Sequence, residues 1–132
     1  MKLIHHSQIL TCLFLMSPVL TVGAADRVRP GQWSGSTTVG GKTFPTSNCI
    51  TQSDANALNG DAKSVQSYLE KIIPPEVCKI AGVKVDGSKV VYSATCAGQP
   101  AKVMTTIYQG TSLEGTDSSG GKSEGKLIGG CK

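Results

Sequence analysis

The side chains able to do acid–base chemistry are mainly carboxylates, because the only two histidines are His5 and His6, near the start of the chain. They lie in a segment with the form of an export leader, and its removal would leave no histidine for a Ser-His-Asp or Cys-His site. Glu114 and Glu124 are expected to face each other across a turn centred near Ser119. One hypothesis is therefore a carboxylate-based hydrolase; the alternative is that these residues are charges on a solvated surface.

Cysteine provides the second set of reactive side chains. An even number of cysteines in a small exported domain favours disulfides, and the four that follow the leader are Cys49, Cys78, Cys96 and Cys131. The chain has no Cys-x-x-Cys pair, which argues against a zinc site and against a thioredoxin-like redox role. We therefore predict two disulfides, no metal, no cofactor and no catalytic residue, and the sequence leans against an enzyme.

The stretch Cys78–Cys96 decides how the cysteines pair. Two β-branched runs flank Asp86-Gly87, a dipeptide typical of a tight type I′ hairpin turn. The two cysteines each lie nine residues from Gly87, which makes them near-opposite in an antiparallel pair. A bulge at Ala81-Gly82 could correct a register that is off by one. We expect Cys78 to pair with Cys96, which leaves Cys49 for Cys131.

Residues 1–24 have the pattern of a signal peptide. Lys2 supplies the positive start, and an apolar run broken by Pro18 follows. Cleavage is expected after Ala24 or Ala25, leaving residues 25–132 as one β-rich domain without a membrane span. We therefore expect a periplasmic or secreted protein.

The first elements of the domain are expected to form a hairpin. A Ser/Thr-rich strand, 33–39, turns at Gly40-Gly41 into a second strand, 42–49. Pro45 lacks an amide hydrogen, so the second strand should have a free edge or a bulge. Trp33 and Phe44 are interpreted as core anchors.

After the second strand the hydrophobic period changes to that of helices. Thr51 and Asp54 form a capping-box pattern before a short helical turn that runs to about Leu58. A second helix is expected over 61–73, with an apolar stripe that covers one face of the sheet. Beyond the central hairpin, strands are expected over 102–108, 111–117 and 122–128. The predicted fold is mainly β (α+β): an antiparallel, curved meander of six to seven strands, with two short helices inserted after the second strand and two disulfides.

Several short motifs in this order resemble those of a family of small exported bacterial proteins, domain of unknown function family 3617. The matching segments are Arg29-Pro30-Gly31-Gln32-Trp33, Cys49-Ile50-Thr51 with Asp54-Ala55, the hairpin Cys78–Cys96, Tyr108-Gln109-Gly110 with Gly115-Thr116, and Gly130-Cys131. The resemblance implies a periplasmic, mostly β protein. It implies no agreed activity.

The leading hypothesis is a non-catalytic domain that binds an envelope protein or a small ligand on its curved sheet. Aromatic residues and methionine carry most of the contact energy at binding sites, so the candidate binding residues are Trp33, Tyr92, Met104 and Tyr108. The alternative for these four is a place in the core. A third hypothesis is a small inhibitor of an envelope-directed enzyme. The basic residues are scattered singly, which argues against nucleic acid as a partner, and we expect a monomer.

Overall fold

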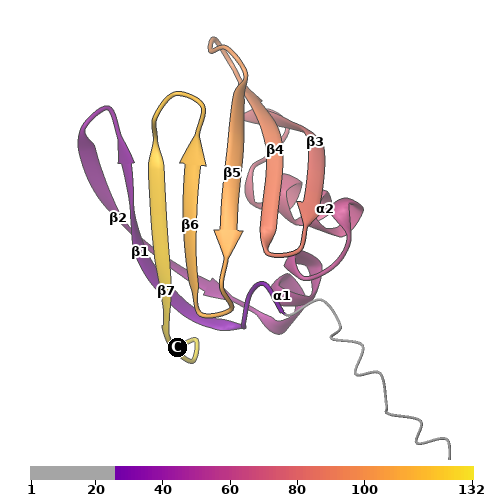
Figure 1. The fold of residues 1–132 in the computed structure, drawn as a ribbon, viewed down its shortest axis with the longest axis vertical. Coiled ribbons are helices and arrows are strands. Elements are labelled where there is room, and N and C mark those ends of the chain that lie inside the picture. The colour runs from indigo at the N-terminus through magenta and orange to yellow at the C-terminus, as the bar shows by residue number, and fades with distance from the viewer. Residues whose placement is uncertain (1–25) are drawn as a thin grey trace, which may run out of the picture.

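The protein folds around one antiparallel sheet of seven strands in the order β2-β1-β7-β6-β5-β4-β3 (Figure 1). The computed structural model describes residues 26–132, so the predicted leader lies outside the described part of the chain. Within that part, no helix is long and apolar enough to cross a membrane. The elements are β1 Gly31–Val39, β2 Lys42–Ile50, α1 Gln52–Leu58, α2 Ala62–Ile72, β3 Cys78–Asp86, β4 Lys89–Cys96, β5 Lys102–Tyr108, β6 Ser112–Asp117 and β7 Lys122–Gly129.

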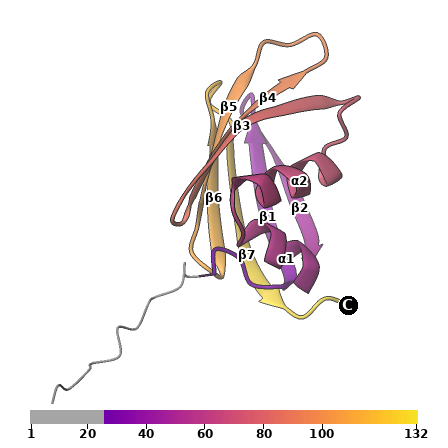
Figure 2. The same cartoon turned by 90° about the vertical axis from the view of Figure 1, so that its right-hand side faces the viewer.

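The predicted fold class is confirmed, including the place of the two helices after the second strand. Each helix begins with the cap that its sequence indicates. Thr51 Oγ1 accepts a hydrogen bond from the amide of Asp54 at 3.1 Å, and Asp61 Oδ1 accepts one from the amide of Ser64 at 2.9 Å. Figure 2 shows that both helices lie on one side of the curved sheet. We call this side of the sheet the inner face and the opposite side the outer face.

The core lies between the helices and the inner face. Leu58 from α1 and Val65 from α2 are buried together with Trp33 of β1 and Val90 of β4. Removing such side chains from water provides about 1.5–3 kcal/mol each. The apolar stripe predicted for the second helix therefore covers the sheet, as the sequence indicates.

The N-terminal hairpin joins the meander through its first strand. β1 pairs with β7 as well as with β2, and Trp33 lies opposite Leu127. At Gly35, an added Cβ would collide with the carbonyl of Glu124 and lie 2.8 Å from the Cα of Gly125. The two backbones thus approach closely where β1 meets β7, and only glycine fits there.

The central hairpin forms as predicted, with a one-residue difference at its turn. Cys78 pairs with Cys96, and the register shifts between Ala81 and Lys84, which confirms the bulge. Gly82, in the bulge, has a φ of 63°. Asp86 pairs with Lys89, so the turn is Gly87-Ser88 and not Asp86-Gly87. Gly87 has a positive φ and Ser88 does not, so the predicted type I′ turn, which needs two, is wrong.

The first hairpin also differs from expectation at one residue. Gly40 and Gly41 both have positive φ angles, 58° and 77°, as a type I′ turn requires. β2 is an edge strand, which explains how it tolerates Pro45. Phe44, expected in the core, is instead 53% exposed. The helices do not cover this end of the edge strand, so no apolar layer packs against the side chain of Phe44.

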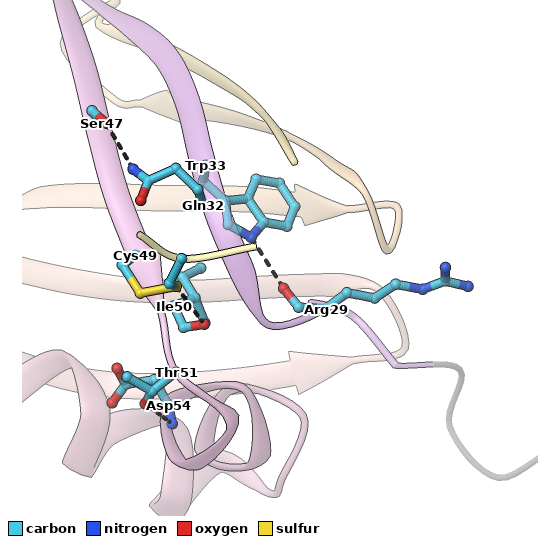
Figure 3. Close-up of a disulfide and its surroundings, with 9 residues drawn as sticks. Arg29, Gln32, Trp33, Ser47, Cys49, Ile50, Thr51 and Asp54 are labelled. Carbon is cyan, nitrogen blue, oxygen red and sulfur yellow. Dashed lines mark hydrogen bonds between the residues drawn. A yellow bond between two sulfur atoms is a disulfide. The ribbon is translucent and has the colours of Figure 1, made fainter. Parts of the chain in front are cut away.

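Both predicted disulfides are present. Cys78–Cys96 closes the open end of the β3–β4 hairpin, with Cα atoms 4.0 Å apart. Cys49–Cys131 ties β2 to the C-terminal residues, with Cα atoms 5.5 Å apart (Figure 3). In the same region, Gln32 Nε2 donates a hydrogen bond to Ser47 Oγ at 2.8 Å, which links β1 to β2.

Candidate functional site

The four candidate binding residues all lie on the inner face of the sheet. Trp33 is part of the buried core, and Tyr92 and Tyr108 both pack against that core. Tyr92 of β4 lies opposite Met104 of β5. The structure therefore places all four on one face, where Trp33 is buried and the other three are partly buried.

Trp33 belongs to the core. It is 4% exposed, and its Nε1 donates a hydrogen bond to the carbonyl oxygen of Arg29 at 3.0 Å (Figure 3). Tyr108 is half-buried and packs against the same core. Burial, assisted by the neighbouring Tyr92 and Tyr68, raises the pKa of Tyr108 above its ordinary value. Trp33 therefore offers no free surface, whereas Tyr108 is partly exposed, as Tyr92 and Met104 are.

Tyr92 and Met104 line a small pocket on the inner face. Its volume is about 210 Å³. Ala94 and the disulfide Cys78–Cys96 continue the wall along the strands, and Ile73, which follows α2, closes one side. The wall is therefore mostly apolar. Burial raises the pKa of Tyr92, so its hydroxyl stays protonated at neutral pH.

Two charged residues, Lys102 and Asp117, also line the pocket, as do Gln99 and Pro100. Asp117 is also a turn residue, because its Oδ1 accepts hydrogen bonds from the amide of Ser119 at 2.7 Å and from the amide of Gly121 at 3.1 Å. A further hydrogen bond from the hydroxyl of Ser119 is the main cause that lowers the pKa of Asp117. The carboxylate thus stays ionised at neutral pH while it holds the β6–β7 turn.

The inner face continues from this pocket toward the first hairpin as a row of small side chains. Thr106 of β5 pairs with Gly115 of β6, Gly115 with Ser123 of β7, and Ser123 with Thr37 of β1. The hydroxyl groups of Thr37 and Ser123 are 3.3 Å apart. Phe44 lies opposite Thr37 on β2, at the far end of the row.

The outer face carries the predicted carboxylate pair. Glu114 of β6 lies directly opposite Glu124 of β7, as expected from the turn between them. Both are exposed, in a groove of about 430 Å³ that also contains Lys122. Ser36 Oγ donates a hydrogen bond to Glu124 Oε1 at 3.5 Å. The pair is open to solvent and has a lysine close by.

A buried arginine is the feature that sequence reasoning missed. Arg27 is 5% exposed, and carbonyl oxygens surround its guanidinium group. Its Nε donates to Gly87 at 2.6 Å, and its Nη1 donates to Leu58 at 2.5 Å and to Gly60 at 3.1 Å. No local pattern marks this residue, since an arginine before the first strand is normally solvated.

Within residues 26–132, no group of three or more histidine, cysteine, aspartate or glutamate side chains could hold a metal ion. The described part of the chain contains one ion pair, between Lys71 and Asp54 at 2.9 Å. It links α2 to α1.

The fold and the paired cysteines define a small disulfide-linked β domain, and comparison with protein families identifies it further. A family described as Protein of unknown function (DUF3617) matches residues 28–131. The chain therefore belongs to this family, which confirms the resemblance found in the sequence. Searches of curated proteins and of solved structures returned no match.

Proposed function

We propose that this protein is a non-catalytic binding domain of the cell envelope, and that the pocket lined by Tyr92 and Met104 receives an apolar group of its partner. The observation that carries the proposal is the pairing of these two residues in a mostly apolar pocket on an otherwise polar part of the inner face. Apolar walls with a few polar groups at fixed places are typical of binding sites.

The size of the pocket favours a group that belongs to a larger partner. Pockets that enclose a whole small-molecule ligand usually measure about 300–1,000 Å³, and this one measures about 210 Å³. A single large side chain or ring would fill it. The exposed side chain of Phe44 lies on the same face and offers a second apolar contact. An envelope protein is therefore a better fit than a small ligand.

The proposed location is the periplasm or the cell exterior. Disulfides persist in oxidising compartments and are rare in the cytosol, and two are present here. The signal-peptide pattern of residues 1–24 supports the same location.

Native mass spectrometry of the protein, purified from its own compartment without refolding, tests the proposal. We expect bound mass on the wild-type domain and its loss in Met104→Glu, which places a charge in the apolar pocket. The matched control is Val103→Glu, because Val103 is 49% exposed on the opposite face of the same strand. Equal bound mass on both variants, or none on the wild-type protein, would reject the proposal.

The carboxylate-based hydrolase remains a second candidate because of the cross-strand geometry of Glu114 and Glu124. Directly opposite residues have Cβ atoms about 4.5–5.5 Å apart, and retaining glycosidases hold their two carboxyl groups at about 5–5.5 Å. The open surroundings of this pair disfavour the candidate. It requires a glycoside-hydrolysing activity that disappears in both Glu114→Gln and Glu124→Gln, and activity that survives both changes excludes it.

A further inference from the structure

The buried Arg27 lies in a second pocket, which is separate from the one that contains Tyr92 and Met104. We call residues 26–29 the strap. The pocket has a volume of about 410 Å³ and lies between the strap, the β3–β4 turn and the residues at the end of β5. Its lining residues are Asp26, Arg27, Arg29, Gly87, Ser88, Tyr108, Gln109 and Gly110.

The strap is held rigidly at this place. Val28 forms a parallel bridge with Gly110. The amide of Gly110 donates to the carbonyl of Arg27 at 3.0 Å, and the amide of Arg29 donates to the carbonyl of Gly110 at 3.1 Å. On the other side, the Asn59 side chain bonds both backbone groups of Val28, at 2.9 and 2.8 Å. The two strap arginines therefore start from a fixed backbone.

Among the described residues, no carboxylate forms an ion pair with Arg27. All of its hydrogen bonds to those residues go to carbonyl oxygens, and they use Nε and Nη1. Nη2 forms no hydrogen bond to residues 26–132, and Arg27 is one of the residues that line the pocket. A buried cation without an anion is costly, and a guanidinium group with accessible N–H donors matches the geometry of an oxyanion.

The other side chains of the pocket suit the same ligand. Arg29 brings a second positive charge, and the hydroxyl of Ser88 and the amide of Gln109 are donors. Asp26 is the one acidic residue of the lining, so the two arginines leave the pocket with a net positive charge. Tyr108 also lines the pocket.

We propose that the pocket between the strap and the β3–β4 turn binds an oxyanion, the carboxylate or phosphate group of a ligand, through Arg27, Arg29 and Ser88. The site shares no lining residue with the apolar pocket. It can therefore exist whether or not the apolar pocket binds a partner.

Amide NMR spectra of the mature, disulfide-linked domain test this site. Sodium phosphate and sodium acetate are titrated separately against sodium chloride at equal ionic strength. We expect saturable shifts of the amides of Gly87, Ser88 and Gly110 with at least one of the two oxyanions, and the salt that produces them identifies the ligand as phosphate or carboxylate. Shifts that match those in chloride for both salts would overturn the proposal.

Substitutions localise the effect. Arg29→Gln should weaken binding by up to about fivefold, as expected for an exposed charge pair. Arg27→Lys should weaken it by about tenfold or more, because a lysine cannot keep the forked geometry. Ser88→Ala serves as a second test if Arg27→Lys does not fold. Lys63→Gln removes the same charge from an exposed site on α2 and should leave binding unchanged. Affinity that falls equally in Lys63→Gln and Arg29→Gln would contradict a defined site.

Discussion

Tyr92 on β4 and Met104 on β5 lie directly opposite each other, and together they line a pocket on the inner face of the sheet. The disulfide Cys78–Cys96 forms part of the same wall. The covalent link that fixes the central hairpin thus also shapes the proposed binding pocket. Reduction of this bond is expected to change the shape of the pocket more than that of the groove on the outer face.

The two disulfides should contribute unequally to stability. Cys49–Cys131 spans 82 residues and Cys78–Cys96 spans 18. In the loop-entropy account, these lengths correspond to about 4.5 and about 3 kcal/mol at 25 °C. We therefore expect Cys49→Ser/Cys131→Ser to lower the free energy of unfolding more than Cys78→Ser/Cys96→Ser, as measured by urea denaturation. The reverse order would show that native contacts near the hairpin matter more than loop length.

Gly35→Ala should weaken the pairing of β1 with β7 and so lower the stability of the domain. The new Cβ would meet backbone atoms of Glu124 and Gly125, which cannot rotate away. Overpacking of this kind costs about 1–3 kcal/mol or more, and thermal unfolding would measure the loss. Gly130→Ala is the matched control, because an added Cβ at that position has no neighbour within 4 Å. Similar melting temperatures for the two variants would refute the close approach.

The tyrosines should ionise only when the domain unfolds. The pKa values of Tyr68, Tyr92 and Tyr108 are all raised, chiefly by burial. The tyrosines of the unfolded chain therefore lose their protons first, at about pH 10. Above this pH the free energy of unfolding falls as the pH rises, because deprotonation favours the unfolded chain. Tyrosinate absorbance should appear together with the loss of circular dichroism. Tyr108→Phe should make the fall in stability with pH less steep, and ionisation at about pH 10 in the folded state would contradict this prediction.

Features that depend on local sequence could be predicted, and features that depend on distant pairing could not. The β3–β4 hairpin, its bulge at Ala81-Gly82 and its disulfide follow from turn residues and spacing. The opposition of Glu114 and Glu124 follows in the same way from the turn between them. In contrast, no local signal indicates that β1 lies beside β7, because that pairing joins the two ends of the domain.

In the candidate sites, too, residue types could be predicted from the sequence, whereas surroundings built by distant elements could not. Trp33, Tyr92 and Met104 could be chosen from residue type, but the full burial of Trp33 and the partial exposure of Tyr92 and Met104 depend on which part of the sheet the helices cover. Phe44 was misplaced for this reason, since an aromatic residue in a strand is usually buried. Arg27 was missed because its environment is assembled from carbonyl groups of α1 and the β3–β4 turn, which the sequence does not bring together.

The most direct test of the apolar pocket uses its methionine as a probe. Met104 is the only methionine in residues 26–132, so methyl-labelled methionine gives one resonance from inside the pocket. Benzyl alcohol is a suitable ligand, since apolar cavities of about 150 Å³ can hold a benzene ring. We predict a saturable shift of this resonance in the wild-type domain and a weaker response in Tyr92→Ala. A Met104 resonance that does not respond, or that changes only linearly with benzyl alcohol, would contradict the existence of a binding pocket at this place.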